Sequence, residues 1–581
     1  AKSGDAPHPR DNILNVSLDA TEDELRKADS LSTGYNWRDN TWEIIVKYSG
    51  SLESIRNRYN VYIKELLNYY AIIVADKATI ELISQEDVID YVEKPKSLYY
   101  QIERTKTAAC VGSVRADGNI LSGKGVIVGV IDTGIDIFDN AFRNSDGTTR
   151  ILNIYDQTTG EKYDKQSIDE YIRLNEDLSG GTFSYDNAPG VDNIMHGTDV
   201  SYIAAGSLGV AYEADIIAVK MGYSINNQFP RTTSLMDAID YIIRKAIEYR
   251  KPVAVNISYG CNYGAHNGNT LLESFIDDIS KSYRCVICVG SGNEADKAIH
   301  FGGIINTGQV QTAYLSVGEY QSAIDIQIWK NYWDTIDVML INPRGEQIGI
   351  ITEGRINRYE TYNTEIITLL GEPSPYNIYQ EIYINLIPKT DYILSGIWQI
   401  VLMAGSIRAG EYNIWLPSSQ ALGYATAFNN PTADGTITIP ATARNCIAVG
   451  AYNAYTNSYA AFSGRGFDNS IRNVNAGVKP DITAPGVDIS IARQRGNDIT
   501  YRNVTGTSYA VPVVTGAAAL LMQWGIVMGN DRFMYGEKLK AALIDGSKPV
   551  GLVGITRNDN QPDPRTGWGA VCLKNTLNKI L

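Results

Sequence analysis

Histidine is scarce in this chain, and the scarcity limits the chemistry that the sequence can support. Only four histidines occur among 581 residues: His8, His196, His266 and His300. Metal sites built from several imidazoles are therefore not expected, and we predict no metal and no cofactor. A reaction that needs an imidazole as general base has few candidates in this sequence.

Cysteines are few and scattered, which argues against a disulfide framework or a zinc site. Six occur, and only Cys285 and Cys288 form a C-x-x-C motif. The motif lies inside Cys285-Val-Ile-Cys-Val-Gly290, an apolar segment that predicts a strand. Residues three apart in a strand point to opposite faces, so we expect two buried core cysteines rather than metal ligands or a redox pair.

Long basic stretches and long apolar runs are also missing. Lys and Arg number 51 against 65 Asp and Glu, so the formal net charge is −14. Without a basic stripe, nucleic acid is not an expected partner. No apolar run approaches the roughly 20 residues that cross a bilayer, and the polar start Ala1-Lys2-Ser3-Gly4-Asp5 has no apolar signal segment. We therefore expect no membrane insertion, and the cellular location stays open.

The length allows about three or four domains, and the pattern changes first near residue 41. Residues 1–40 are polar, with one helix expected near 21–29. Residues 41–104 alternate three strands with two helices, which predicts a small α+β unit, and they end in an extended tail at 95–101. This unit is either an ordinary N-terminal domain or a pro-region whose tail lies in a substrate groove.

Alternating strands and helices predict an α/β domain built from two segments, 105–294 and 435–581. A continuous apolar run at 125–131 is typical of a strand buried on both faces of a parallel sheet, whereas 141–195 is rich in loop residues. The intervening residues 295–434 contain short strands separated by Gly, Pro and Asn turns. They predict an inserted β-sandwich or jelly roll, which we expect to serve stability or partner contact.

Three short motifs stand in a fixed order along the α/β segments. Asp132-Thr-Gly ends the first buried strand, at the edge where ligands collect in open parallel sheets. His196-Gly-Thr and Gly506-Thr-Ser508 each open a run of small residues typical of a helix start. A helix N-terminus offers free N–H groups and a partial positive charge to an oxyanion. Taken singly, Asp132 is equally typical of a turn and Ser508 of a helix cap.

Together the three residues fit nucleophilic catalysis. A serine hydroxyl is a weak nucleophile, so hydrolysis of an amide needs a neutral imidazole to take its proton and a carboxylate to orient that imidazole. The chain order Asp, His, Ser is the order found in subtilisin.

The sequence resembles the subtilases, the subtilisin-like serine proteases. The resemblance covers about 105–294 and 435–550 and implies a subtilisin-like α/β domain with a mostly parallel sheet and endopeptidase activity on a protein or peptide substrate. The matching residues are the three motifs above and three further segments. These segments are Ser291-Gly-Asn293, Lys479-Pro-Asp-Ile-Thr-Ala-Pro-Gly486 and Tyr509-Ala-Val-Pro512.

The resemblance implies a role for each matching residue. Ser508 is expected to be the nucleophile, His196 the general base and acid, and Asp132 the carboxylate that orients the imidazole. Asn293 is expected to donate its side-chain amide to the oxyanion beside the Ser508 backbone N–H. Removing such a donor typically costs about 10²–10³ in turnover. The segments expected to flank the substrate backbone and its P1 side chain are Ser258-Tyr259-Gly260 and Ser291-Gly292.

Features outside the α/β segments resemble the Csp-type germination proteases of clostridia and related gut subtilases. They are the polar N-terminus, the tail Glu93-Lys-Pro-Lys-Ser-Leu-Tyr-Tyr100 and the insert after Asn293. In that group the insert is a jelly roll, and a ferredoxin-like pro-region assists folding, is cut by the enzyme and can stay bound. The resemblance implies self-cleavage near Tyr99, Tyr100 or Gln101, with Tyr or Gln tolerated at P1, and a pro-region that remains bound non-covalently. It also implies activation of a cortex-degrading hydrolase zymogen in a spore- or cell-associated location.

Two positions depart from the usual subtilase pattern. Asp199 stands where a second histidine is usual and adds a negative charge near His196, and Tyr509 replaces a smaller residue after the nucleophile. With the large insert, they leave open a regulatory pseudoprotease whose groove is blocked by residues 97–104. A broad-range nutritional protease is a third alternative. The acidic loops at 136–139 and 559–563 are expected to be solvated rather than to bind calcium.

Overall fold

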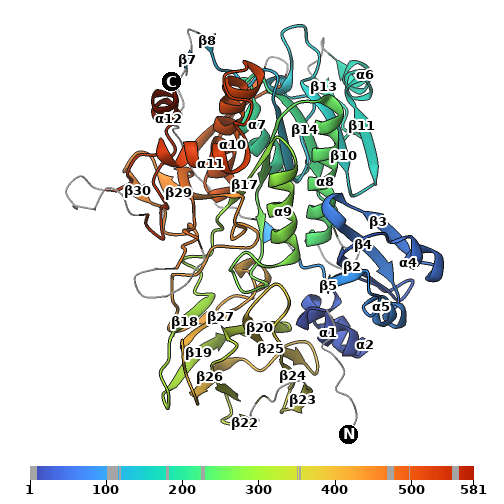
Figure 1. Cartoon of the computed structure of the whole chain (residues 1–581), viewed down its shortest axis with the longest axis vertical. Coiled ribbons are helices and arrows are strands. Elements are labelled where there is room, and N and C mark those ends of the chain that lie inside the picture. The colour runs from blue at the N-terminus through green and yellow to red at the C-terminus, as the bar shows by residue number, and fades with distance from the viewer. Residues whose placement is uncertain are drawn as a thin grey trace.

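The computed structural model describes residues 10–97, 99–100, 115–116, 119–177, 182–223, 229–349, 351, 355–467, 477–495, 498–551 and 562–581. These residues form an N-terminal α+β part, a central α/β part and a β-rich part (Figure 1). His8, Gln101 and Cys110, which the sequence analysis singled out, lie outside the described residues.

The N-terminal part is an antiparallel sheet with two short helices, as the pattern in 41–104 predicted. β2 pairs with β4 and β5, β3 pairs with β4, and the short β1 pairs with β2. Its elements are β1 (Tyr35–Asn36), β2 (Thr41–Tyr48), α4 (Glu53–Arg58), β3 (Tyr62–Glu65), η1 (Leu67–Tyr69), β4 (Tyr70–Ala75), α5 (Lys77–Ile83) and β5 (Ile89–Glu93).

Residues 10–40, the described part of the first segment, hold three helices where the sequence predicted one. The predicted helix is α2, which begins with a capping box between Thr21 and Glu24. The prediction missed α1, although the Asp11 side chain accepts a hydrogen bond from the Leu14 N–H at 2.7 Å as an N-cap. Tertiary burial stabilises this short helix, since its apolar side chains join the core of the N-terminal part. The helices are α1 (Asn12–Asp19), α2 (Glu22–Lys27) and α3 (Asp29–Ser32).

The central part is built on a nine-stranded sheet in the order β11-β10-β14-β9-β15-β17-β29-β30, with β31 beside β29. The pairs between β10 and β29 and the β29–β31 pair are parallel, and β11 and β30 are antiparallel edges. The strands are β9 (Ile127–Asp132), β10 (Ile151–Asp156), β11 (Glu161–Asp164), β14 (Asp215–Lys220), β15 (Val253–Ile257), β17 (Cys285–Gly290), β29 (Ile447–Asn453), β30 (Ser458–Tyr459) and β31 (Ile482–Pro485). This sheet confirms the predicted α/β class.

Helices cover both faces of this sheet. α7 (His196–Ala205) and α10 (Thr507–Met522) pack against each other on one face, while α8 (Thr232–Tyr249) and α9 (Leu271–Ser282) lie on the other. The remaining helices of this part are α6 (Lys165–Asn175), α11 (Gly536–Asp545), α12 (Leu573–Ile580) and the short turns η2 (Asn140–Phe142) and η4 (Gln523–Val527).

The buried cysteines of β17 confirm the alternation argument. Cys285 belongs to the core under α8 and α9, and Cys288 belongs to the core under α7 and α10. Burial raises the pKa of each thiol to about 12. They therefore act as small apolar core residues.

One helical segment, Thr507–Val527, is long and apolar enough to cross a membrane by length and composition. However, 89% of its most apolar window is buried inside the protein, as expected for the central helix of a packed domain.

One expectation for the loops near the first strand is wrong, and another is incomplete. The stretch 141–195 is rich in loops as expected, but it also contains β10, β11 and α6, which were not predicted. Only Ile168 and Ile172 of α6 are buried, so its apolar pattern was weak. Asp136 and Asp139 are buried rather than solvated, with exposed fractions of 3% and 0%. Their partners come from distant segments, which local sequence does not reveal.

The β-rich part, called the insert below, comprises residues 300–428 and forms two antiparallel sheets around a shared core. Most of the predicted strands are present, among them 324–329 within β20 and 381–387 within β25. One sheet contains β18 (His300–Ile304), β27 (Glu411–Trp415), β20 (Ile324–Asn331), β25 (Tyr379–Pro388), β24 (Thr364–Leu370) and β23 (Ile356–Glu360). The other contains β22 (Gln347–Ile348), β21 (Ile336–Ile341), β26 (Gly396–Ala404), β19 (Val310–Val317) and β28 (Ala427–Phe428).

Several short elements complete the described structure. The 3-10 turn η3 (Ser419–Ala421) follows the last long strand of the insert. The two-stranded pairs are β6 (Tyr99–Tyr100) with β16 (Tyr259–Gly260), β7 (Arg115–Ala116) with β8 (Asn119–Ile120), β12 (Glu176–Asp177) with β13 (Thr182–Phe183), and β32 (Ile489–Arg495) with β33 (Asp498–Val504).

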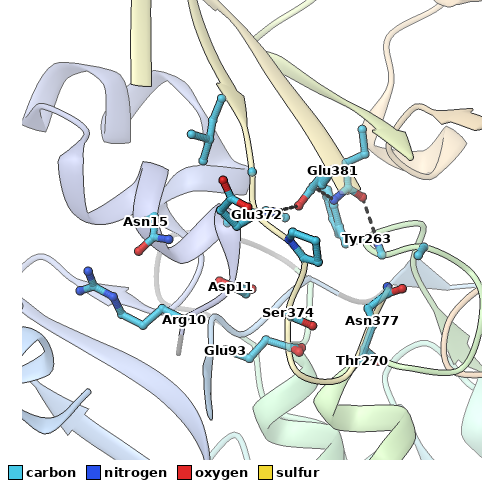
Figure 2. A pocket seen from close by; sticks show the side chains of 18 of the residues that line it. Arg10, Asp11, Asn15, Glu93, Tyr263, Thr270, Glu372, Ser374, Asn377 and Glu381 are labelled. Atoms are coloured by element: carbon cyan, nitrogen blue, oxygen red, sulfur yellow. Dashed lines mark hydrogen bonds between the residues drawn. The ribbon is translucent and has the colours of Figure 1, made fainter. Parts of the chain in front are cut away.

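The three bodies meet around the N-terminal part. Its sheet and η1 contact α8 and α9, while α1 and α2 contact β25 of the insert (Figure 1). A cavity of about 680 Å³ lies at this junction. Figure 2 shows that its walls come from all three bodies, with Asp11 and Glu93 from the N-terminal part, Tyr263 from the α/β part and Glu381 from the insert.

Candidate active site

Asp132 and His196 lie in direct contact at the end of β9 and the start of α7. The distance between Asp132 Oδ1 and His196 Nδ1 is 2.6 Å. Both side chains are buried, with exposed fractions of 1% and 2%. In the neutral imidazole, this hydrogen bond places the proton on Nδ1 and the lone pair on Nε2.

The turn before α7 is held by a carboxylate that the sequence analysis missed. Asp192 accepts hydrogen bonds from the Met195 N–H at 2.7 Å and from the Thr198 N–H at 2.8 Å. It also accepts from the Thr133 hydroxyl, whose oxygen accepts from the Gly197 N–H at 2.8 Å. An Asp shortly before a helix start was the available signal. These bonds tie the residues around His196 to the residue after Asp132.

Gly197 is required by close packing between the two motifs. A Cβ atom at this position would lie 2.3 Å from the Gly134 carbonyl oxygen and 2.9 Å from the Asp132 Cβ. Both distances are far below contact, so any larger residue would separate the strand end from the helix.

Ser508 lies at the start of α10 and is fully buried. The helix begins at Thr507, and its N-cap is Gly506, whose φ of 144° suits glycine. The interpretation of Ser508 as a helix cap is therefore wrong, because the capping position is two residues earlier. Beneath the serine, the Ser258 hydroxyl donates to the Ser508 carbonyl at 3.5 Å.

Asn293 follows β17 and reaches the residue before Ser508. Its Oδ1 accepts hydrogen bonds from the Thr507 N–H at 3.0 Å and from the Thr507 hydroxyl at 3.1 Å. Its Nδ2 is buried, and within the described part of the chain it has no hydrogen-bond partner. An unsatisfied buried donor costs about 1–3 kcal/mol. This amide is thus a donor that an incoming acceptor would satisfy.

The segment expected to flank the substrate backbone already carries a strand from the N-terminal part. β6 pairs with β16 in antiparallel register, with Tyr100 opposite Tyr259 and Tyr99 opposite Gly260. Just before β6, Ser97 forms an antiparallel bridge with Arg231. The described part of the tail, residues 95–97 and 99–100, therefore runs beside the segment expected to flank the substrate backbone.

Ser291 and Gly292, predicted to flank the P1 side chain, lie against the segment that returns from the insert. The Thr438 N–H donates to the Ser291 carbonyl at 3.0 Å. A Cβ atom at Gly292 would lie 2.6 Å from the Thr438 methyl carbon, so the glycine permits this close approach.

Asp199, one of the two departures, is fully buried and ion-paired. Its carboxylate binds Arg493 of β32 and Arg502 of β33. The same two guanidinium groups donate to the Met195 carbonyl oxygen at 3.0 and 3.2 Å. The negative charge that Asp199 adds is therefore compensated by two cations.

Tyr509, the other departure, packs beside the imidazole. The centroids of the Tyr509 and His196 rings are 5.3 Å apart. The tyrosine is 3% exposed, and burial raises the pKa of its hydroxyl well above the usual range. Its ring therefore serves as an apolar neighbour of the imidazole.

Comparisons with known proteins identify the class that this fold and site define. The description "Subtilase family" matches residues 123–373 and 409–569. The chain belongs to the subtilase family and is a serine protease. A second description, "Csp protease B prodomain", matches residues 9–96, a span that crosses the boundary predicted at residue 40.

One solved structure gives a narrower likeness. The chain is similar to the CspB protease of Clostridium perfringens, with 34% identity and a TM-score of 0.71 over 79% of this chain and 93% of that chain. Two curated relatives match shorter segments. The subtilase-type proteinase RRT12 of Saccharomyces cerevisiae is 33% identical over 128 residues, and subtilisin-like protease 10 of Arthroderma otae is 34% identical over 120. These alignments span only 23% and 27% of the relatives' lengths.

Among the residues that the structure describes, no group of three or more His, Cys, Asp or Glu side chains is placed to hold a metal ion.

Proposed function

We propose that the protein is a self-processing serine endopeptidase in which Ser508, His196 and Asp132 form the catalytic triad. The observation that carries this proposal is the buried 2.6 Å contact between Asp132 Oδ1 and His196 Nδ1 in a chain of the subtilase family. The carboxylate fixes the tautomer and stabilises the imidazolium that forms during the reaction.

Acylation begins with transfer of the Ser508 hydroxyl proton to His196 Nε2. The Ser508 oxygen then bonds to the carbonyl carbon of the scissile peptide, and the carbonyl oxygen becomes an oxyanion. The Asn293 side-chain amide and the Ser508 backbone N–H donate to that oxyanion, which satisfies the buried Nδ2. The C–N bond then breaks, and the imidazolium gives its proton to the leaving amine.

Deacylation repeats these steps with water. His196 takes a proton from the water molecule, the resulting hydroxide oxygen bonds to the acyl carbon, and the ester bond to Ser508 breaks. The imidazolium returns its proton to the serine oxygen, so the enzyme is regenerated and needs no cofactor.

The first substrate is the protein's own N-terminal part. The pairing of β6 with β16 supports a cut near Tyr99, Tyr100 and Gln101, followed by retention of the prodomain as a non-covalent partner. Ser258, Tyr259 and Gly260 bind the substrate backbone in this scheme, and Ser291 and Gly292 flank its P1 side chain.

The test of this proposal is the full chain carrying Ser508→Ala. We expect it to remain a single uncut polypeptide, whereas the wild-type chain separates into a prodomain of about 100 residues and the mature enzyme; intact mass spectrometry measures both. Normal self-cleavage by the variant would show that Ser508 is not the nucleophile.

The physiological substrate that we propose is a single protein zymogen of a cortex-degrading hydrolase. The support is the match to the Csp protease B prodomain and the likeness to CspB protease. A panel of unrelated proteins incubated beside such a zymogen distinguishes the alternatives. Cleavage of the zymogen at one bond supports a processing enzyme, and equal digestion of the whole panel indicates a nutritional protease.

The pairing of β6 with β16 also favours a second candidate function. In this alternative the protein is a regulatory pseudoprotease whose groove stays blocked. A fluorophosphonate probe separates the two, because it reacts only with an accessible, activated serine. Labelling of Ser508 in the processed protein excludes the permanently blocked form.

A further inference from the structure

We infer that the insert forms one wall of the substrate groove, at η3, and that Glu294 holds this wall in position. The inference rests on the proposed function, in which β6 occupies the groove as the first acyl product. It assigns the insert a part in substrate selection, beyond the stability or partner contact expected from the sequence.

The tail strand has neighbours from two bodies. On one side its backbone pairs with β16 of the α/β part. The turn η3, which belongs to the insert, also lies beside β6. Within η3, Ala421 packs against the core that contains Tyr259, and Gln420 is exposed. A substrate that replaces β6 would therefore meet the insert as well as the catalytic sheet.

Glu294 connects this turn to the site. Its Oε2 accepts a hydrogen bond from the Ser419 N–H at 3.0 Å, and its Oε1 accepts from the Ser419 hydroxyl at 3.1 Å. The glutamate is only 7% exposed, so both bonds form in a largely dry environment. Glu294 directly follows Asn293 in the chain. The turn η3 is therefore bonded to the residue next to the proposed oxyanion donor.

The protonation state of Glu294 affects this connection. Burial raises the pKa of its carboxyl to about 7, while the charged groups facing it are Lys297 and Asp296. The ionised carboxylate accepts both bonds from Ser419, and protonation weakens them because charged acceptors form the stronger hydrogen bonds. The turn is therefore held most firmly above about pH 7.

The side chains of η3 are small at Ser419 and Ala421, the two positions that flank the exposed Gln420. The tail places Tyr99 and Tyr100 next to this turn. We expect η3 to select for bulky residues shortly before the cleaved bond, and a larger side chain in η3 to reverse that preference.

The test follows self-cleavage of the full chain during cell-free synthesis, with the variants Glu294→Gln, Ser419→Ala and Ala421→Leu. Losing a hydrogen bond to a charged group should slow the cut about tenfold in Glu294→Gln. Asp296→Asn is the matched control, since that carboxylate pairs with Lys297 at 3.1 Å rather than with η3. We also expect the ratio of wild-type to Glu294→Gln rates to rise between pH 6 and pH 8.

A double-mutant cycle tests contact with the tail. Ala421→Leu should slow cleavage of the natural tail at least fivefold, and Tyr99→Ala or Tyr100→Ala should restore part of the rate. Fluorophosphonate labelling of Ser508 in each processed variant shows that the chain is folded. If Ala421→Leu fails to fold, Gln420→Glu at the exposed position of the turn replaces it in the cycle.

The outcomes separate this inference from the proposed function. Cleavage at the wild-type rate in Glu294→Gln and in the η3 variants, without coupling to the tail, overturns the inference while the Ser508→Ala result still stands. Self-cleavage by Ser508→Ala overturns the proposed function itself.

Discussion

At the scale of single residues, the site depends on a few side chains that hold others in place. The Asn293 Oδ1 accepts two hydrogen bonds from Thr507. These bonds fix the orientation of the amide plane and therefore the direction in which its NH2 group points. Asp192 similarly fixes the turn before His196. In the proposed mechanism, Asp192 contributes by positioning His196, and Thr507 contributes by positioning the Asn293 amide. A displacement of about 1 Å can cost about 10² in rate.

Replacing Asn293 by Ala should lower kcat by about 10²–10³ with little change in KM, because the donor acts on charge that develops only in the transition state. Steady-state kinetics on a peptide ester measures this. Thr507→Val serves as a graded companion: it removes only the hydroxyl bond to Asn293, and we expect a smaller loss. An unchanged kcat in Asn293→Ala would remove this residue from the mechanism.

Asp192→Asn should impair catalysis through the helix start. The amide keeps the shape of the carboxylate, but its NH2 group replaces one of the two oxygens and so faces the N–H donor of either Met195 or Thr198. We expect kcat to fall about tenfold or more, with a loss of about 1–3 kcal/mol in stability. Asp186→Asn, which lies on the same loop, is the control for a non-specific change of charge. Equal effects of the two substitutions on kcat would contradict the positional role.

At the scale of elements, the strand pair β32–β33 links α7 and α10. It leads directly into Gly506 and α10, and its arginines reach across to Asp199 on α7 and to Asp136 after β9. One element thus contacts the structure around all three residues of the proposed triad. Asp136 also accepts from the Tyr185 hydroxyl, which completes its buried surroundings.

Arg493→Met should destabilise this strand pair and leave Asp199 with one cation fewer. Removing one partner of a buried ion pair typically costs about 3–5 kcal/mol, so a lower Tm by thermal unfolding is the expected outcome. The double variant Asp199→Asn with Arg493→Met removes the uncompensated charge and should recover part of that loss. A double variant as unstable as the sum of the singles would show that the pair does not interact.

The element scale also shows where sequence reasoning succeeded. Continuous apolar runs predicted β9 and β17, because a strand that is buried on both faces can be recognised without knowing which strands flank it. The same reasoning missed β10 and α6, whose patterns are diluted by polar residues facing water. The motifs pointed to Asp132, His196, Asn293 and Ser508, which the structure gathers around two helix starts. Asp192 was missed although its bonds to Met195 and Thr198 are local and an Asp before a helix start was an available signal. The arginines of β32–β33 were missed because Asp199 and Asp136, their partners, lie far away in the sequence.

At the scale of the whole molecule, buried ionisable groups join the prodomain to the other bodies. Lys96 Nζ lies 2.6 Å from Glu93, whose other oxygen accepts from the Leu271 N–H at the start of α9. Toward the insert, Asn12 donates to Glu381 at 3.0 Å. These contacts connect the prodomain to the α/β part and to the insert. We therefore expect the charge states of these buried groups to affect how tightly the prodomain binds.

Retention of the cleaved prodomain should therefore depend on pH. Burial raises the pKa of Asp11 to about 6 and that of Glu381 to about 7. On separation both carboxyls meet water and titrate near pH 4. Between about pH 4 and pH 7 the bound form thus holds more protons than the separated form, so binding weakens as pH rises through this window. Anisotropy of a labelled prodomain measures it, and Glu381→Gln should flatten the curve.

Above neutrality the trend should reverse. Burial lowers the pKa of Lys94 to about 7, whereas the free ammonium titrates near 10.4. Between these values the separated form holds more protons, and binding strengthens with rising pH. The prodomain should be held most weakly near pH 7. A steady loss of affinity through pH 9 would show that Lys94 is not buried in the complex.

The pairing of β6 with β16 has a consequence for how activity develops in time. In the proposed self-processing scheme, each chain supplies one inhibitor and one enzyme, so the two are always made in equal numbers. Dissociation of the inhibitor then depends on the total protein concentration. At high concentration the enzyme stays inhibited, and dilution below the dissociation constant releases active enzyme. The active fraction of such a protease therefore depends on its own local concentration.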